Sequence, residues 1–201
     1  SFQAPSFFQL FSSFGDPNTK PESGEGWDIA YEQAFADGKV CFTTTLFGNE
    51  VKDKIIFSFN SFTYANEDVY ESEGVENALR FQVANNASAT LAYTYSDANY
   101  QDGIEAERVP RNIISLGFDF TPIEDVNISA SALAVSSQFS TRNSIMKQDG
   151  YEVFNIAARY DVDDRTQIWA RIDNFFDEEY EEVQTFQTAG FSVYGGVRLN
   201  F

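Results

Sequence analysis

The stretch Phe191-Ser-Val-Tyr-Gly-Gly-Val-Arg-Leu-Asn-Phe201 alternates between two kinds of residue along its whole length. Apolar side chains fall at Phe191, Val193, Val197 and Leu199, and mostly polar ones fall between them, as at Arg198. Because successive side chains of an extended chain point to opposite faces, this period of two predicts a β-strand. The strand would have one apolar face and one face that tolerates charge.

The same period of two recurs along the chain, and no segment shows a convincing helical period. The alternation predicts an antiparallel, all-β protein of about nine strands. We expect them near residues 27–35, 40–50, 72–84, 87–97, 110–120, 125–137, 150–160, 165–174 and 190–201. Leu116, Phe118, Ile156, Ile168, Val197 and Leu199 should share one exposed face, and Ser129, Arg159, Arg171 and Arg198 should share the other.

The connections between these segments alternate in length. Short turns are expected at Asp37-Gly38, Asn85-Asn86, 121–125 and 161–164, and long polar segments at 49–71, 97–109, 137–150 and 175–189. Consecutive antiparallel strands with this alternation place all the long loops at one end. Outer-membrane β-barrels have this asymmetry, and ten tilted residues span their apolar band of about 25 Å.

The composition excludes several classes of function. The 201 residues hold 31 Asp and Glu against 13 Lys and Arg, a net charge of −18, which argues against a nucleic-acid partner. There is no His, so the commonest general base and metal ligand is missing, and the single Cys41 excludes an internal disulfide. No apolar stretch is long enough for a transmembrane helix. No enzyme motif, cofactor site or metal site is recognisable.

Two architectures fit the alternation: a transmembrane β-barrel and a soluble β-sandwich or solenoid. Charged and amide residues on most of the polar faces favour the barrel, because a sandwich must bury one face of each sheet. The apolar rows also end in aromatic residues such as Tyr95, Phe120 and Phe191. Aromatic residues at strand ends are typical of the girdles at the two membrane interfaces.

The long loops hold the candidate binding residues. Aromatic side chains that could stack on a large ligand are Phe62, Tyr64 and Tyr100. The alternative for segment 49–71 is a hairpin that extends the strands beyond the membrane. The acidic run Asp177-Glu-Glu-Tyr-Glu-Glu182 is either a calcium site or a solvated loop, and the spacing favours the loop. Cys41 and the arginines 80, 159, 171 and 198 are interpreted as lining of the barrel interior.

Three groups of motifs resemble a known family. They are Phe2-Gln-Ala-Pro-Ser6 with Gly15-Asp-Pro-Asn18, Lys20-Pro-Glu-Ser23 and Trp27; Ile172-Asp-Asn-Phe-Phe-Asp177; and Phe186-Gln-Thr-Ala-Gly190 before the last strand. Over residues 2–201 the chain resembles the C-terminal part of a TonB-dependent outer-membrane receptor. The stretch 186–190 is most similar to the vitamin B12 (cobalamin) receptor subgroup.

The resemblance implies a fold and partners that the residues alone do not establish. Members of the family have an N-terminal plug inside the barrel, which residues 1–201 would lack, and the plug end would contact the TonB complex. The apolar positions Val197, Leu199 and Phe201 resemble the C-terminal signal recognised by the barrel-assembly machinery. The implied location is the outer membrane of a Gram-negative bacterium, with its lipid as a partner.

The implied function is active import of a scarce, bulky nutrient, either a cobalamin or a ferric siderophore, without an enzymatic step or a cofactor. A passive porin or structural outer-membrane barrel is the alternative, and a soluble secreted adhesin is a third hypothesis. In each barrel case we expect residues 1–201 alone to form an open, curved sheet. Its edges would be the strands near 27–35 and 190–201, and the last strand would pair only with segment 165–174.

Overall fold

The computed structural model describes residues 1–58, 61–141 and 146–200. Nine long strands run antiparallel to one another in sequence order and form a single sheet, with the two-residue strand β1 (Phe2–Gln3) beside the first of them. These nine are β2 (Glu22–Phe35), β3 (Val40–Ser58), β4 (Thr63–Ala84), β5 (Ala87–Tyr100), β6 (Asn112–Ile123), β7 (Val126–Val135), β10 (Tyr151–Asp163), β11 (Thr166–Asp173) and β14 (Ser192–Leu199). All nine strands predicted from the alternation are confirmed.

Several elements were not expected from the sequence. Two small hairpins lie inside the long connections: β8 (Gln138–Phe139) with β9 (Lys147–Gln148), and β12 (Glu181–Val183) with β13 (Phe186–Gln187). One short helix, α1 (Phe7–Phe11), begins with a capping box between Ser6 and Gln9. Among the described residues, no helix is long and apolar enough to cross a membrane.

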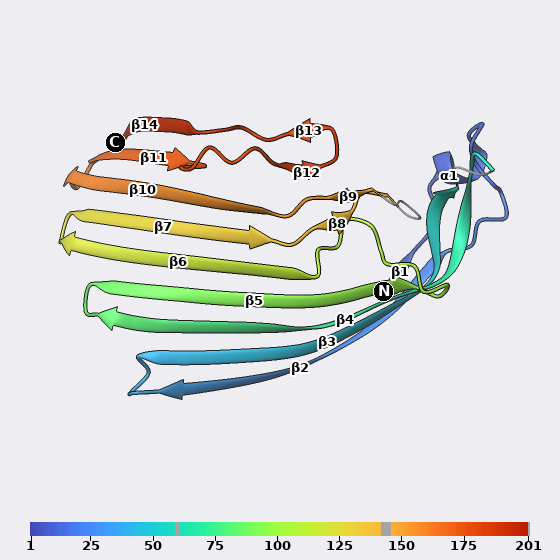
Figure 1. Cartoon of the computed structure of the whole chain (residues 1–201), viewed down its shortest axis with the longest axis horizontal. Coiled ribbons are helices and arrows are strands. Elements are labelled where there is room, and N and C mark those ends of the chain that lie inside the picture. The colour runs from blue at the N-terminus through green and yellow to red at the C-terminus, as the bar shows by residue number, and fades with distance from the viewer. Residues whose placement is uncertain (59–60, 142–145, 201) are drawn as a thin grey trace.

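The sheet is curved and open. Figure 1 shows the short turns together at one end and every long connection at the other, as predicted. β14 pairs only with β11, so it forms one edge of the sheet. At the opposite edge, β1 pairs with the start of β2 through Phe2↔Ser23 and Gln3↔Glu22. The prediction of a free edge along segment 27–35 is therefore confirmed. The part of β2 before residue 27 is covered in part by β1.

The register places the predicted apolar set on one face. Leu116 lies opposite Leu91 and Ala132, and Ile168 lies opposite Tyr160 and Val197. The exposed fractions of Leu116, Phe118, Ile168, Val197 and Leu199 run from 40% to 61%, whereas Ile156 is partly buried. A row of large apolar side chains this exposed is expected where hydrocarbon is the solvent.

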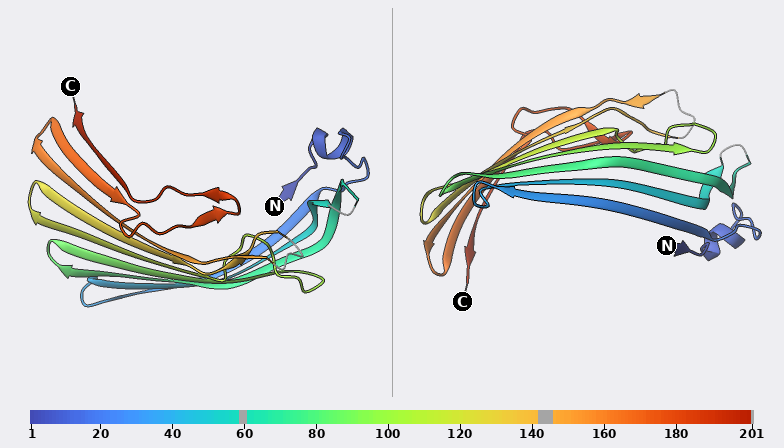
Figure 2. Two further views of the ribbon diagram at one scale, coloured as in Figure 1. Left: turned by 45° about the horizontal axis from the view of Figure 1, so that its top comes forward. Right: turned by 90° about the horizontal axis from the view of Figure 1, so that it is seen from below.

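The polar set lies on the concave face. Ser129, Arg159, Arg171 and Arg198 alternate with the apolar set along β7, β10, β11 and β14. Tyr151 shares their face of β10, and its ring stacks on Tyr180, at the start of the β12–β13 hairpin, with centroids 4.3 Å apart. Figure 2 shows this hairpin inside the curve of the sheet. The polar face is therefore the one that would line a barrel interior.

The β3–β4 hairpin contains most of segment 49–71. The two strands stay paired in one register from Val40↔Phe81 to Ser58↔Thr63. The hairpin thus extends the sheet well beyond the apolar band, as the second interpretation of that segment predicted. A Cβ added at Gly74 would collide with the Tyr95 carbonyl oxygen and with the Phe47 ring, so a larger residue there would displace backbone as well as the ring.

The assignment of faces can be tested with a matched pair of arginine substitutions in the full-length protein. Leu116→Arg places a charge near the middle of the apolar face and should cost about 2–4 kcal/mol of unfolding free energy in lipid vesicles. Ser115→Arg, one residue away, points to the concave side and should cost less than about 1 kcal/mol. Equilibrium guanidinium unfolding measures both, and equal losses would contradict the assignment.

Candidate ligand-binding vestibule

Two long connections meet on the concave side at the end of the sheet that carries the long loops. They are the described parts of the β7–β10 connection and the whole β11–β14 connection. Between them lies a cavity of about 580 Å³. Its wall is polar and includes Ser140, Lys147, Asp149, Glu179, Tyr180 and Thr188. We refer to this cavity as the vestibule.

Asn174 organises the loop that forms one wall of the vestibule. It is 3% exposed and has a φ of 52°, a left-handed conformation that Asn tolerates better than most residues. Its side-chain Oδ1 accepts from the Glu178 N–H at 2.9 Å, and its Nδ2 donates to the carbonyls of Glu178 and Ala189 at 2.9 and 3.3 Å. Its own N–H donates to Asn155 Oδ1 at 2.9 Å. The Asn174 side chain therefore ties the two ends of the loop together, and its backbone N–H links them to β10.

Two buried glutamines join the loops across the vestibule. Gln138 and Gln148, from the β8–β9 hairpin, are each 9% exposed. Gln138 Nε2 donates to Gln148 Oε1 at 3.4 Å and to the Glu182 carbonyl at 3.5 Å, and Gln148 Nε2 donates to the Glu181 carbonyl. The stack of Tyr151 on Tyr180 adds an aromatic contact on the same side. No sequence pattern singles out these two glutamines.

The vestibule carries an excess of negative charge. Five carboxylates, from Asp149, Asp177, Glu178, Glu179 and Glu181, line it together with Lys147. Asp177 accepts from the Phe191 N–H at 2.7 Å, and Glu181 accepts from the Thr185 N–H at 2.7 Å, so these two also hold the loop in shape. Within residues 1–58, 61–141 and 146–200, no three acidic or thiol side chains are grouped to hold a metal ion. The solvated loop therefore stays a prediction for residues 177–182.

The three predicted ligand-binding aromatics fall in two separate places. Phe62 is 63% exposed at the tip of the β3–β4 hairpin, and Tyr64 packs edge-on against Phe57 with centroids 5.4 Å apart. Tyr100 is 3% exposed on the concave face, stacked edge-on against Tyr70 with its hydroxyl 3.1 Å from a carboxylate oxygen of Glu107. Direct ligand contact by Phe62 and Tyr64 stays a prediction.

Tyr100 has a structural environment that the sequence does not reveal. It forms a small buried cluster with Ala98 and Ala106, which brings the loop after β5 back onto the sheet. Lys54 lies with its Nζ 3.9 Å from the centre of the Tyr70 ring, a favourable cation–π geometry. Burial raises the pKa of the Tyr70 phenol, in the part of β4 beyond the apolar band. A role for Tyr100 in binding therefore requires this loop to move, and it stays a prediction.

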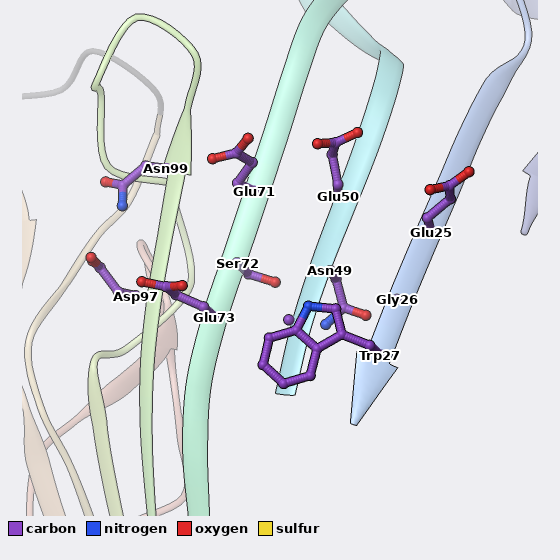
Figure 3. A pocket seen from close by; sticks show the side chains of 11 residues that line it. Glu25, Gly26, Trp27, Asn49, Glu50, Glu71, Ser72, Glu73, Asp97 and Asn99 are labelled. Carbon is purple, nitrogen blue, oxygen red and sulfur yellow. The ribbon is translucent and has the colours of Figure 1, made fainter. Parts of the chain in front are cut away.

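A second cavity, of about 570 Å³, lies on the other face of the sheet. Figure 3 shows the carboxylates of Glu25, Glu50, Glu71, Glu73 and Asp97 gathered from four neighbouring strands around Trp27. The register puts them on the same face as Ile29, Leu46 and Val75, beyond the apolar band. This acidic surface thus faces outward, and it is not part of the vestibule.

The predicted lining residues lie on the concave face. Cys41 is paired with Arg80 across β3 and β4 and is partly buried. Arg171 forms an ion pair with Asp173 at 3.2 Å, and its guanidinium lies 4.5 Å from the centre of the Tyr194 ring. Val197 and Leu199, two of the predicted assembly-signal residues, are exposed on the apolar face, and Phe201 lies outside the described residues.

The fold and the sequence agree with one family. The family described as TonB dependent receptor-like, beta-barrel matches residues 1–175. The chain belongs to this family. The family is one of receptors and transporters of the Gram-negative outer membrane.

Solved structures share the fold over the whole chain. The copper transporter OprC superposes with a TM-score of 0.85 at 18% identity, covering 100% of this chain and 36% of that one. A G324V mutant of the ferric enterobactin receptor PfeA from Pseudomonas aeruginosa gives 0.83 at 16% identity, covering 100% and 37%. The pyoverdine receptor FpvA from Pseudomonas aeruginosa PAO1 gives 0.76 at 16% identity, covering 100% and 32%. The chain thus spans about a third of their length.

The role of Asn174 can be tested by substitution in the full-length receptor. Asn174→Ala removes three side-chain hydrogen bonds and should lower the local stability of residues 175–190 by about 1–3 kcal/mol. Amide hydrogen exchange of that loop should accelerate accordingly, with the strands unchanged. Gln187→Ala, in the same loop, is the control and should leave exchange as it was. Unchanged exchange in the Asn174 variant would contradict the assigned role.

Proposed function

We propose that this chain is the C-terminal part of the barrel of a TonB-dependent importer, which takes a scarce, bulky nutrient across the outer membrane. The family match over residues 1–175 carries the proposal. The polar concave face supports it, because such a face suits a water-filled or plugged interior. In the full-length receptor, the energy would come from the TonB complex through an N-terminal part. Assembly would use the apolar positions Val197, Leu199 and Phe201.

The charge of the vestibule bears on the two nutrient classes. Five carboxylates against one lysine repel anions and attract cationic or neutral hydrogen-bond donors. A ferric catecholate carries net negative charge, whereas a corrinoid presents amide groups around its ring. We therefore favour a cobalamin-like ligand, consistent with the similarity of segment 186–190 to that subgroup, over an anionic ferric siderophore. The structural relatives named above act on copper, ferric enterobactin and pyoverdine, so the fold itself does not discriminate.

Uptake measurements separate these hypotheses. The full-length protein would be produced in a Gram-negative host that lacks its own cobalamin and siderophore receptors, with and without TonB. We expect TonB-dependent accumulation of labelled cyanocobalamin and little accumulation of a ferric catecholate. TonB-dependent uptake of the ferric catecholate alone would overturn the preferred ligand and leave the importer intact.

A different outcome would overturn the importer itself. A passive porin admits small solutes by diffusion, so its uptake would not depend on TonB or saturate at low concentration. TonB-independent permeability to small sugars, without saturable nutrient binding, would support the porin alternative. Detergent-extracted protein measured by calorimetry with cyanocobalamin gives a second readout that does not depend on the host.

A further inference from the structure

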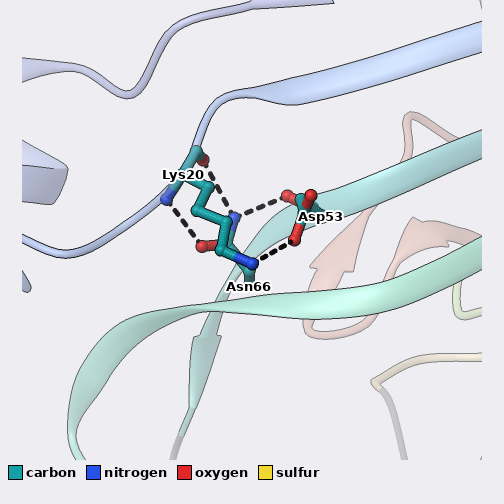
Figure 4. Close-up of polar contacts among 3 residues, drawn as sticks. All are labelled: Lys20, Asp53 and Asn66. Carbon is teal, nitrogen blue, oxygen red and sulfur yellow. Dashed lines mark hydrogen bonds and ion pairs between the residues drawn. The ribbon is translucent and has the colours of Figure 1, made fainter.

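One asparagine fastens the N-terminal segment, residues 1–21, to the tip of the β3–β4 hairpin. The Lys20 N–H donates to Asn66 Oδ1 at 2.7 Å, and Asn66 Nδ2 donates to the Lys20 carbonyl at 2.9 Å (Figure 4). The same Nδ2 donates to the Asp53 carbonyl at 2.6 Å. The Asn66 amide thereby gives the Lys20 backbone the donor and the acceptor that a neighbouring strand would otherwise supply. It joins the segments that contain Lys20, Asp53 and Asn66. We call this set of bonds the Asn66 latch.

Further contacts hold the segment on either side of the latch. The Tyr64 N–H donates to the Phe14 carbonyl at 2.8 Å, and the Ile55 N–H donates to Glu22 Oε1 at 2.6 Å. Rings of the segment also pack edge-on against the hairpin: Phe8 against Tyr64 at 6.1 Å and Phe14 against Phe57 at 6.0 Å. The N-terminal segment is therefore bound to the tip along much of its length, and α1 lies beside the tip.

The latch sits where the hairpin changes direction. Asp53 has a φ of 55°, in the left-handed region that is unfavourable for most residues other than glycine. Up to Lys52, the side chains of β3 alternate regularly between the two faces of the sheet. Figures 1 and 2 show the tip turned away from the direction of the long strands. Asp tolerates this region better than most residues, and a residue that departs from the extended conformation at a bend can serve as a hinge.

We propose that residues 6–20 of the N-terminal segment and the hairpin tip (residues 54–58 and 61–66) move as one rigid body, closed by the Asn66 latch and pivoting at Asp53. Two loops that follow different strands thus respond together, and a contact made by either one shifts both. This coupling is a property of the fold. It goes beyond the proposed import function and does not depend on which nutrient is carried.

The geometry of the latch predicts different effects for substitutions at Asn66 and at Lys20. Asn66 binds the main chain of Lys20, so the Lys20 side chain is dispensable. The Lys20 side chain forms an ion pair between its Nζ and Asp53 Oδ1 at 3.5 Å, with side chains 69% and 36% exposed, and such pairs contribute little. Removing the Asn66 amide should therefore loosen the two joined segments, whereas removing the Lys20 ammonium should not.

Hydrogen exchange of the full-length receptor in detergent tests the coupling. In Asn66→Ala, exchange should accelerate about tenfold or more in residues 12–20 and in residues 61–66 together. Lys20→Ala should exchange as the unmodified receptor does. Asn99→Ala is the matched control: this asparagine lies in the same end of neighbouring β5, and its side chain has no hydrogen bond within the described residues.

Asn66→Asp keeps the acceptor for the Lys20 N–H but loses both donors. Its carboxylate also repels the carbonyl oxygens of Lys20 and Asp53, so exchange should accelerate in the same two segments at least as much as in Asn66→Ala. This second variant keeps the test decisive if Asn66→Ala fails to fold. Heat-modifiable migration in gels reports correct folding of each variant. Acceleration confined to one of the two segments, or equal acceleration in Lys20→Ala and Asn66→Ala, would overturn the proposal.

Discussion

The structure depends on one constraint: in hydrocarbon, every backbone N–H and C=O must be hydrogen-bonded within the protein. Nine long strands in one antiparallel ladder pair each strand with its neighbours, and open edges remain at β14 and along the part of β2 that β1 does not cover. An open edge in lipid leaves unpaired groups that cost several kcal/mol each. The ladder also fixes which side chains face outward, because the register ties the alternation of each strand to that of its neighbours. A single sheet with one apolar and one polar face follows.

Beyond the apolar band, different interactions hold the chain. The strands of the β3–β4 hairpin continue in water, where their backbone pairing alone is marginal, and aromatic contacts such as Phe57 on Tyr64 support the tip. Elsewhere, asparagine side chains act as substitutes for backbone partners. Asn66 holds the N-terminal segment and Asn174 holds the β11–β14 loop, and each bonds both donor and acceptor groups. These amides give long, polar loops a defined shape without a large apolar core.

The distribution of charge separates two surfaces that the composition cannot distinguish. The net charge of −18 is a property of the whole sequence. In the fold, one group of carboxylates lines the vestibule on the concave side, and another gathers around Trp27 on the outer side. In the proposed importer, a ligand entering the barrel would meet the first group, whose charge would favour a neutral or cationic ligand.

The sequence by itself determined the strands, their faces and the end at which the long loops lie. Strand patterns are local: the alternation from Phe191 to Leu199 shows the two faces without any knowledge of the neighbours. Only the tertiary structure decided that Tyr100 is buried against Tyr70, that β1 covers the start of β2, and that Asn66 joins segments 46 residues apart. Such contacts depend on how the loops fold back onto the sheet. The local sequence around a polar loop residue is the same whether its side chain contacts water or the backbone of a distant segment.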